Sequence, residues 1–108
     1  MEKKGFHRKL TAILSADVAG YSRLMQDDET ATVTTLESYK QAFFDLIKQH
    51  RGHVVDSPGD NLLAEFASVV DAVQCAVAVQ KEFHAHNAEL PEHRRMLFRI
   101  GVNLGDVI

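Results

Sequence analysis

The sequence has few of the residues that form disulfide bonds in small domains, and it lacks the long apolar runs that insert into membranes. Its 108 residues include one cysteine, two prolines and no tryptophan. A single cysteine excludes an intrachain disulfide, and Cys75 lies in an apolar helical run, where a packed side chain is expected rather than a reactive thiol. No apolar run is long enough to span a bilayer, and no signal-type apolar segment follows the basic N-terminus. We therefore expect a cytoplasmic location and no membrane segment in this chain.

The charge balance has no large excess of either sign. Twelve Lys and Arg residues against fifteen Asp and Glu residues give a net charge of −3, which excludes a global attraction to nucleic acid or to anionic lipid. Hydrophobic residues make up 45% of the chain, enough for one ordinary globular core. We expect a weakly basic tail over residues 1–8 and a single domain over residues 9–108.

The strands are predicted from apolar residues that alternate or form short runs. A Pro58-Gly59 turn separates the two short runs, since proline fixes φ and glycine accepts a positive φ in such turns. The four predicted strands cover residues 10–17, 53–55, 62–66 and 96–104.

The helices are predicted from apolar spacing and from residues typical of helix ends. A short helix is expected over residues 20–26. A long one begins after Asp27 or Asp28 and ends before Gly52, which we expect to be its C-terminal glycine. A second long helix begins after Ser68, whose following residues resemble a capping box.

Together these elements follow the order β-α-α-β-β-α-β, which is typical of an α+β, ferredoxin-like fold with an antiparallel sheet. In that topology the third strand lies between the first two and is antiparallel to both. The C-terminal end of the first strand, at Asp17, then adjoins the N-terminal end of the third strand, at Asp60. The sequence therefore predicts that these two carboxylates meet at one edge of the sheet, beside the helix that starts at Gly20.

Two converging carboxylates beside a helix start suit a hard divalent cation that carries a phosphate. Carboxylate oxygens are ligands for Mg²⁺ or Mn²⁺, and the free amides of a helix start face an anion. The expected ligand is a metal-bound nucleoside triphosphate, ATP or GTP. The simpler interpretations are that Asp17 only caps a helix and that Asp60 only shapes a turn. The candidate phosphate-binding amides are those of Ala19, Gly20, Tyr21 and Ser22.

Three stretches, in this order, resemble the catalytic domain of class III adenylate/guanylate cyclases. They are Asp17-Val18-Ala19-Gly20-Tyr21-Ser22, Gly59-Asp60 with the strand after it, and Arg99-Ile100-Gly101-Val102-Asn103-Leu104-Gly105. The stretch Phe66-Ala67-Ser68-Val69-Val70-Asp71-Ala72 is also similar to that family's strand-to-helix junction. The resemblance covers nearly the whole chain from Arg8 and implies the N-terminal part of such a domain.

The resemblance implies a reaction and roles for named residues. Asp17 and Asp60 would hold two divalent ions, Mg²⁺ or Mn²⁺, with the Val18 carbonyl as a further ligand. One ion would activate the ribose 3′-hydroxyl and both would hold the triphosphate, so that a 3′,5′-cyclic nucleotide forms and pyrophosphate leaves. A head-to-tail homodimer is also implied, because the family's sites are assembled from both subunits.

Two features depart from the family's pattern. Asp56 stands four residues before Asp60, where adenylate cyclases carry an adenine-reading Lys and guanylate cyclases an acidic residue, so Asp56 is a candidate for base recognition. The chain ends at Ile108, where the family's domain still has a strand pair and a helix to come, with the Asn and Arg that steady the transition state. We therefore expect an incomplete domain, weakly active or inactive alone, that associates with a second copy or with the missing part.

Two other function classes fit parts of this pattern. A non-catalytic ferredoxin-like module for dimerisation or nucleotide binding would keep the fold without the cyclase activity. A palm-type phosphoryl-transfer domain also places carboxylates at strand ends, but this chain lacks a Gly-Gly-Asp/Glu-Glu-Phe-like signature. Histidines do not suggest a metal site, since His84 and His86 are two residues apart on a predicted helix and point to different sides.

Overall fold

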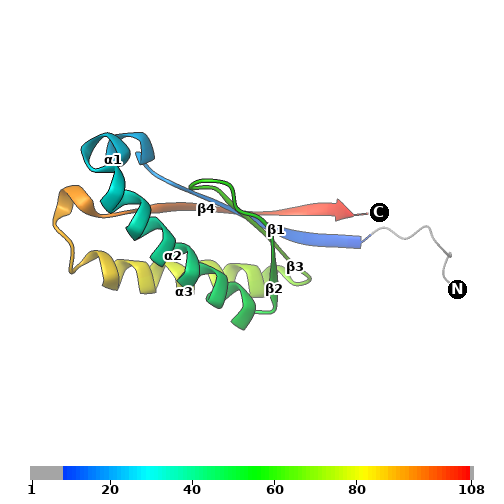
Figure 1. Ribbon diagram of the computed structural model, residues 1–108. Coiled ribbons are helices and arrows are strands. Elements are labelled where there is room, and N and C mark those ends of the chain that lie inside the picture. The colour runs from blue at the N-terminus through cyan, green and yellow to red at the C-terminus, as the bar shows by residue number, and fades with distance from the viewer. Residues whose placement is uncertain (1–8, 108) are drawn as a thin grey trace, which may run out of the picture.

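The computed structural model describes residues 9–107, with side chains described from 11 to 105. The expected tail over residues 1–8 lies outside the described residues. The described chain forms four strands, three α-helices and one short 3-10 turn (Figure 1). In chain order they are β1 (Lys9–Val18), α1 (Tyr21–Asp27), α2 (Glu29–Gln49), β2 (Gly52–Asp56), β3 (Leu62–Phe66), α3 (Val69–Asn87), η1 (Glu92–Arg94) and β4 (Phe98–Val107).

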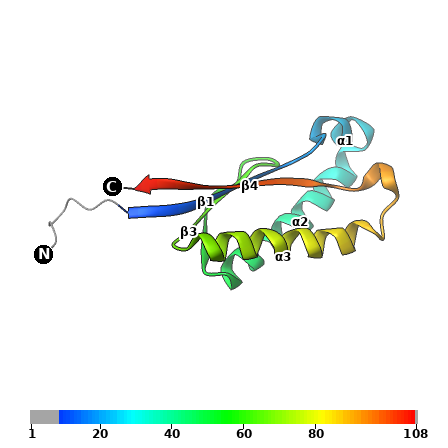
Figure 2. The ribbon, with the colours of Figure 1, turned by 180° about the vertical axis from the view of Figure 1, so that it is seen from behind.

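The four strands form one sheet in the order β2-β3-β1-β4, and every neighbouring pair is antiparallel. β3 therefore lies between β1 and β2, as the predicted topology requires. Helices α2 and α3 lie on the same side of the sheet, and α1 lies at the end where β1 finishes (Figures 1 and 2). The predicted α+β, ferredoxin-like order of elements is confirmed, and η1 adds a short turn within the loop before β4.

The residues of β1 alternate between two faces of the sheet. Ala12, Leu14 and Ala16 are buried against the helices, with 6% or less of their surface exposed. Because successive side chains of a strand point to opposite faces, Ser15 and Asp17 lie on the face that the helices leave open (Figures 1 and 2). The alternation that predicts the strand thus also places Asp17 outside the core.

Aromatic rings join the two long helices to β4. Phe83 of α3 lies with its ring centroid 5.2 Å from that of Phe98, and Phe43 of α2 meets both rings edge-on at 5.9 and 5.8 Å. Such pairs add to the stabilisation that burial provides. Cys75 is fully buried among these elements, and burial raises the pKa of its thiol to about 11. The thiol is therefore a packed, protonated side chain, as the sequence predicts.

Two helix starts are capped as the sequence predicts. The side chain of Asp28 accepts a hydrogen bond from the N–H of Ala31 at 3.0 Å, and α2 begins at the next residue. The hydroxyl of Ser68 accepts one from the N–H of Asp71 at 3.3 Å, and α3 begins after it. Each cap satisfies an amide that the first turn of a helix otherwise leaves unpaired.

The prediction that Gly52 ends α2 as its C-terminal glycine is wrong. Arg51 adopts the left-handed conformation after the helix, with φ 65°, and Gly52 is the first residue of β2. A Cβ on Gly52 would overlap the ring of Phe66 and would lie 2.8 Å from Cγ2 of Ile47. Glycine is needed here because β2 passes close to the core, which the local sequence does not reveal.

Candidate functional site

Asp17 lies one residue before the end of β1, directly opposite Arg99 of β4 in the antiparallel ladder. The guanidinium of Arg99 donates from Nε to Oδ1 at 2.8 Å and from Nη2 to Oδ2 at 3.0 Å. This hydrogen bonding, together with the guanidinium charge, holds the pKa of Asp17 below its ordinary value and raises the pKa of Arg99. Asp17 is therefore a charged carboxylate at neutral pH with both oxygens engaged by a cation.

Asp60 lies in the turn between β2 and β3, two residues before Leu62 begins β3. Its Oδ2 accepts a hydrogen bond from the backbone N–H of Val18 at 3.1 Å. Since Val18 follows Asp17 directly, both acidic residues lie at the same edge of the sheet, as the strand order predicts. The charge of Asp60 also contributes to the raised pKa of Arg99, so the three charges are within electrostatic reach of one another. The role of the two carboxylates as metal ligands stays a prediction.

The donor atoms at this edge fit a hard divalent cation that brings further oxygen ligands with it. Asp17, Asp60 and the Val18 carbonyl offer oxygen, which Mg²⁺ and Mn²⁺ prefer. Within the part of the chain that the structure describes, no group of three or more His, Cys, Asp or Glu side chains is arranged to hold a metal ion. Magnesium sites on phosphate substrates often use only one or two carboxylates. Phosphate or water oxygens would complete the shell, and Arg99 would have to release Asp17.

The turn between β1 and α1 has fewer free amides than the sequence suggests. Gly20 precedes α1 with φ 66°, a conformation that favours glycine. The N–H of Ala19 donates to the carbonyl of Leu97 at 2.8 Å, so it is not free for a phosphate, and Ala19 leaves the predicted set. Among the described residues no side chain caps the start of α1. The amides of Gly20, Tyr21 and Ser22 remain the candidates.

Asp56 ends β2, at the point where the pairing of β2 with β3 becomes irregular. It is exposed, and its Oδ1 accepts a hydrogen bond from the N–H of Ser57 at 2.9 Å. An exposed carboxylate can accept hydrogen bonds from a base or from water equally well. Its predicted role in base recognition therefore stays a prediction.

A hollow of about 450 Å³ lies on the open face of the sheet beside Asp17. The side chains of Asp17 and Arg99 are 37% and 68% exposed, so a ligand can reach both. Gly101 leaves space at this point, because a Cβ there would meet only Oγ of Ser15, at 3.8 Å. The residues that line the hollow are Ser15, Ala16, Asp17, Asn61, Arg99, Ile100 and Gly101.

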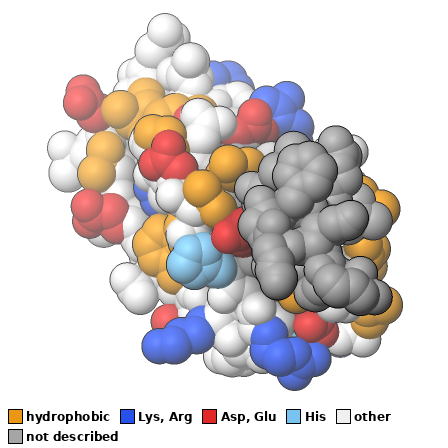
Figure 3. All heavy atoms as spheres, turned by 90° about the vertical axis from the view of Figure 1, so that its right-hand side faces the viewer, with side chains coloured by type: hydrophobic (Ala, Val, Ile, Leu, Met, Phe, Trp, Pro, Cys, Tyr) orange, Lys and Arg blue, Asp and Glu red, His pale blue; other side chains and the backbone are white. Residues whose placement is uncertain are grey.

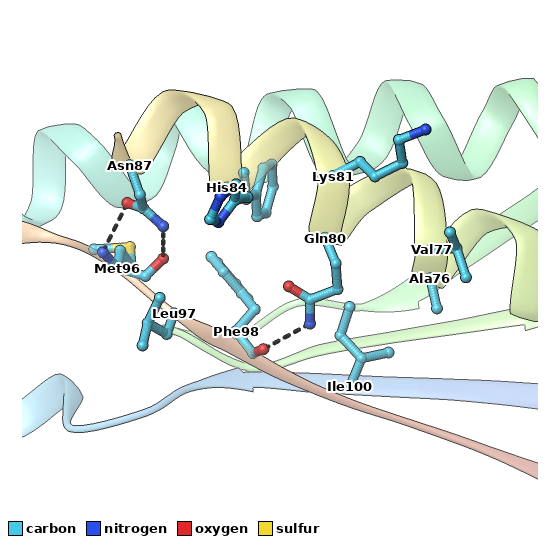
Figure 4. A pocket seen from close by; sticks show the side chains of 11 residues that line it. Ala76, Val77, Gln80, Lys81, His84, Asn87, Met96, Leu97, Phe98 and Ile100 are labelled. Carbon is cyan, nitrogen blue, oxygen red and sulfur yellow. Dashed lines mark hydrogen bonds between the residues drawn. The ribbon is translucent and has the colours of Figure 1, made fainter. Parts of the chain in front are cut away.

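A second hollow, of about 730 Å³, lies between α3 and β4 (Figure 4). Two of its polar side chains, Asn87 and Gln80, are hydrogen-bonded to the backbone of β4 and of the segment before it. Asn87 donates to the carbonyl of Met96 at 2.9 Å and accepts from its N–H at 3.0 Å, and Gln80 donates to the carbonyl of Phe98 at 2.9 Å. The lining, which lies within the described residues, contains no carboxylate. We therefore do not place a metal-bound triphosphate there.

No role for Arg99 or Lys40 follows from the sequence pattern, although Arg99 binds Asp17 and Lys40 binds the turn that carries Asp60. Arg99 lies on a predicted strand, and alternation places it on one face of the sheet, but the register that sets it opposite Asp17 comes only from the structure. Lys40 of α2 donates from Nζ to the carbonyls of Ser57 and Gly59, both at 2.9 Å. These carbonyls are 17 and 19 positions after Lys40 in the chain, a separation at which no short sequence pattern indicates a contact.

The surface carries charges of both signs. Figure 3 shows acidic and basic side chains interspersed with apolar ones on the face that it presents, without a large area of one sign. This distribution agrees with the small net charge of −3. Among the residues that the structure describes, no helix has the length and apolar character needed to cross a membrane.

Comparison with known proteins adds sequence and fold relatives. No family model matches the chain. It is 47% identical over 109 aligned residues to a Rhizobium meliloti protein named "Putative adenylate cyclase 3", a match that covers 100% of this chain and 19% of that protein. It is 30% identical to a Myxococcus xanthus protein named serine/threonine-protein kinase pkn2, over 94% of this chain and 12% of that protein.

The fold matches solved cyclases. A crystal structure of an adenylate/guanylate cyclase/hydrolase from Silicibacter pomeroyi superimposes with a TM-score of 0.83 and 38% identity. That match covers 93% of this chain and 59% of the solved chain. The chain thus spans about a fifth or less of the curated relatives that it matches, and somewhat over half of this solved cyclase. By sequence and fold, this chain is similar to part of the solved adenylate/guanylate cyclase from Silicibacter pomeroyi and to part of the Rhizobium meliloti protein.

Proposed function

We propose that this chain is the part of a metal-dependent nucleotidyl cyclase domain that carries the acidic edge, that is, the end of the sheet where Asp17 and Asp60 lie and where a cation would bind. The reaction would convert ATP or GTP to the 3′,5′-cyclic nucleotide and pyrophosphate. The observation that supports this best is the hydrogen bond from the Val18 N–H to Oδ2 of Asp60, at 3.1 Å. It fixes one carboxylate beside the strand end that carries Asp17, because the strand order brings the end of β1 next to the turn before β3.

Within this proposal, Asp17, Asp60 and the Val18 carbonyl hold Mg²⁺ or Mn²⁺. When bound, the ion supplies neutralisation of phosphate charge and a lower pKa for the attacking hydroxyl. Asp60 is oriented in advance by the Val18 amide, whereas Asp17 must first exchange its Arg99 partner. Orientation before binding reduces the entropic cost of assembling a ligand shell.

Arg99 has a role in this exchange. Once Asp17 turns to a cation, the guanidinium of Arg99 keeps its charge and its parallel N–H donors, which match a phosphate as well as a carboxylate. The side chain is 68% exposed and borders the hollow beside Asp17. Arg99 would hold a phosphate in this hollow. The amides of Gly20, Tyr21 and Ser22 do not line the hollow and would be the backbone donors for a phosphate at the start of α1.

Asp56 and the oligomeric state extend the proposal. The exposed carboxylate of Asp56 would accept hydrogen bonds from a purine base. Because the chain corresponds to 59% of the solved cyclase from Silicibacter pomeroyi, we propose that residues 9–108 form part of a cyclase domain. Alone they would be weakly active or inactive, and a complete site would need the rest of such a domain or a second copy.

The test is a titration of the chain with Mn²⁺ and ATP or GTP, followed by electron paramagnetic resonance of the free ion. We expect nucleotide-dependent Mn²⁺ binding that falls at least tenfold in Asp17→Ala and in Asp60→Ala, since each removes a charged oxygen ligand. Asp45→Ala is the control, because Asp45 is an exposed carboxylate on α2, outside the acidic edge. Equal Mn²⁺ affinity in Asp17→Ala and in Asp45→Ala would contradict the proposal.

One observation favours the alternative, a non-catalytic ferredoxin-like module. Both oxygens of Asp17 accept hydrogen bonds from Arg99. As a cross-strand ion pair, this arrangement needs no bound cation to neutralise Asp17. If the chain binds neither Mn²⁺ nor nucleotide, while Asp17→Ala and Arg99→Ala lower its free energy of unfolding or change its oligomeric state, this structural role of the pair is the better account.

A further inference from the structure

The turn that carries Asp60 is joined to the rest of the molecule through few groups. Inside the turn, the N–H of Asn61 donates to the carbonyl of Pro58 at 2.9 Å and the hydroxyl of Ser57 donates to the carbonyl of Asn61 at 3.1 Å. Apart from the bond from the Ser57 N–H to the side chain of the preceding Asp56, the hydrogen bonds that link residues 57–61 to other elements among the described residues come from Lys40 and from the Asp60 carboxylate. The turn's own bonds set its shape, and these links set its position.

Lys40 holds the side of the turn that faces α2. Its Nζ donates to the carbonyls of Ser57 and Gly59, each at 2.9 Å. An ammonium group has three N–H donors and no acceptor, so two converging carbonyls are suitable partners. Gly59 itself takes φ 55°, and no atom lies within 4 Å of the position that a Cβ would occupy. The tip of the turn is therefore not held by side-chain packing at Gly59.

The carbonyl of Gly59 is part of the peptide group that also contains the N–H of Asp60. In a planar trans peptide the C=O and N–H point in opposite directions. When Nζ of Lys40 fixes the Gly59 carbonyl, it therefore fixes the plane of the peptide that begins Asp60. The side chain of Asp60 leaves the backbone one bond later and reaches the Val18 amide.

We infer that Lys40 is a positioning residue for the Asp60 carboxylate. This inference rests on the proposed function for its consequence in cation binding, but its geometry is independent of that function. Lys40 acts through the turn, since its Nζ is bound to turn carbonyls. Loss of the Nζ would let the turn move and would let Asp60 leave the Val18 amide.

The Val18 N–H reports directly on the position of Asp60, because its partner is Oδ2 of that residue. Hydrogen exchange of this amide, followed by NMR, measures how often the bond opens. Lys40→Met keeps the apolar part of the side chain and removes Nζ. We expect exchange at Val18 to rise about tenfold in Lys40→Met, and exchange at the buried Leu14 of β1 to stay within twofold.

Two further variants separate positioning from general effects. Lys40→Arg keeps a charged donor and is expected to restore slow exchange at Val18, within threefold of the unchanged chain. Lys48→Met, on the same helix, removes an exposed Lys in the last turn of α2 and is expected to change neither amide. If Lys40→Met leaves exchange at Val18 unchanged, the inference is wrong. If it raises exchange at Leu14 equally, the effect is a general loss of folding and the inference is also wrong.

Cation binding provides the second readout, with MnCl₂ and ATP as the probe. We expect the Mn²⁺ dissociation constant to rise 10- to 100-fold in Lys40→Met, the range typical of residues that orient a metal ligand. Fast exchange at Val18 with unchanged Mn²⁺ affinity would overturn the link to cation binding. If the unchanged chain binds no Mn²⁺, the proposed function fails, and the exchange at Val18 alone decides whether Lys40 positions Asp60.

Discussion

Two hydrogen-bonded groups of residues in this molecule differ in their burial and in their charge. The Asn87 network consists of Tyr39, Asn87 and Met96, and the Asp17 cluster consists of Asp17, Asp60 and Arg99. Tyr39 donates its hydroxyl to Oδ1 of Asn87 at 2.7 Å, and the Asn87 amide bonds both the N–H and the carbonyl of Met96. In the Asn87 network all three residues are buried, with 5% or less of their surface exposed.

The Asp17 cluster differs in burial and in charge. Asp17 is over a third exposed and its partner Arg99 is over two thirds exposed, so water can replace either partner. Bonds between neutral buried groups cannot be exchanged without leaving a donor or acceptor unpaired, whereas exposed ions can change partners at small cost. The comparison indicates that the Asn87 network maintains the fold and that the Asp17 cluster is suited to binding.

The largest loss of stability is expected at Asn87. Asn87→Leu keeps the side-chain size and leaves the Tyr39 hydroxyl and the Met96 N–H and carbonyl without partners. At about 1–3 kcal/mol for each unpaired buried group, the free energy of unfolding should fall by about 3 kcal/mol or more. Urea unfolding followed by circular dichroism measures this loss.

Gln80→Leu is the control for this substitution. It removes one hydrogen bond, from the side-chain amide of Gln80 on the same helix to the carbonyl of Phe98. Because Gln80 is exposed, water can then donate to that carbonyl. We expect a loss of about 1 kcal/mol. If both substitutions cost the same, burial does not distinguish the Asn87 network, and the comparison with the Asp17 cluster fails.

The next largest effect is expected at Gly52, at the partly buried start of β2. Gly52→Ala forces a methyl group into the Phe66 ring, and such overpacking costs about 1–3 kcal/mol. Gly101→Ala, on the open face beside Asp17, finds space at 3.8 Å from Ser15 and should leave stability unchanged or raise it by up to about 1 kcal/mol. Thermal unfolding of the two variants tests this. Equal destabilisation would mean that the open face is packed as tightly as the core.

The sequence predicts some parts of this arrangement and not others, for physical reasons. Alternation along the first strand and the order of elements are properties of the chain itself, and they suffice to bring Asp17 and Asp60 to one edge. The function of Gly52 depends on Phe66, which is distant in sequence, so a local rule about helix ends assigned it wrongly. The local sequence likewise predicts a free Ala19 amide, because its partner, the carbonyl of Leu97, lies far along the chain.

The smallest effect on stability is expected for the ion pair of the Asp17 cluster. The pKa of Asp17 in the folded chain lies below its ordinary value of 3.8 because Arg99 hydrogen-bonds to it and attracts its charge. A lowered folded pKa means that the pair stabilises the fold above pH 3.8 and that this contribution is lost as the pH falls through the folded value. Arg99→Gln removes that contribution, and the loss should be smaller than for Asn87→Leu or Gly52→Ala and should shrink further in high salt.

A carbon NMR titration of the Asp17 carboxyl group separates this pair from the rest of the molecule. In Arg99→Gln the pKa of Asp17 should return to 3.8 or above, because partial burial, which raises it, then acts without the guanidinium. Arg95→Gln is the control, since Arg95 bonds the carbonyl of Leu90 in the loop before β4 and should leave Asp17 unchanged. An unmoved pKa in Arg99→Gln would mean that Arg99 does not neutralise Asp17 in solution. A pKa that rises while the fold is kept would establish that the carboxylate can lose its cation without unfolding the sheet, which is the property that exchange of Arg99 for a divalent ion requires.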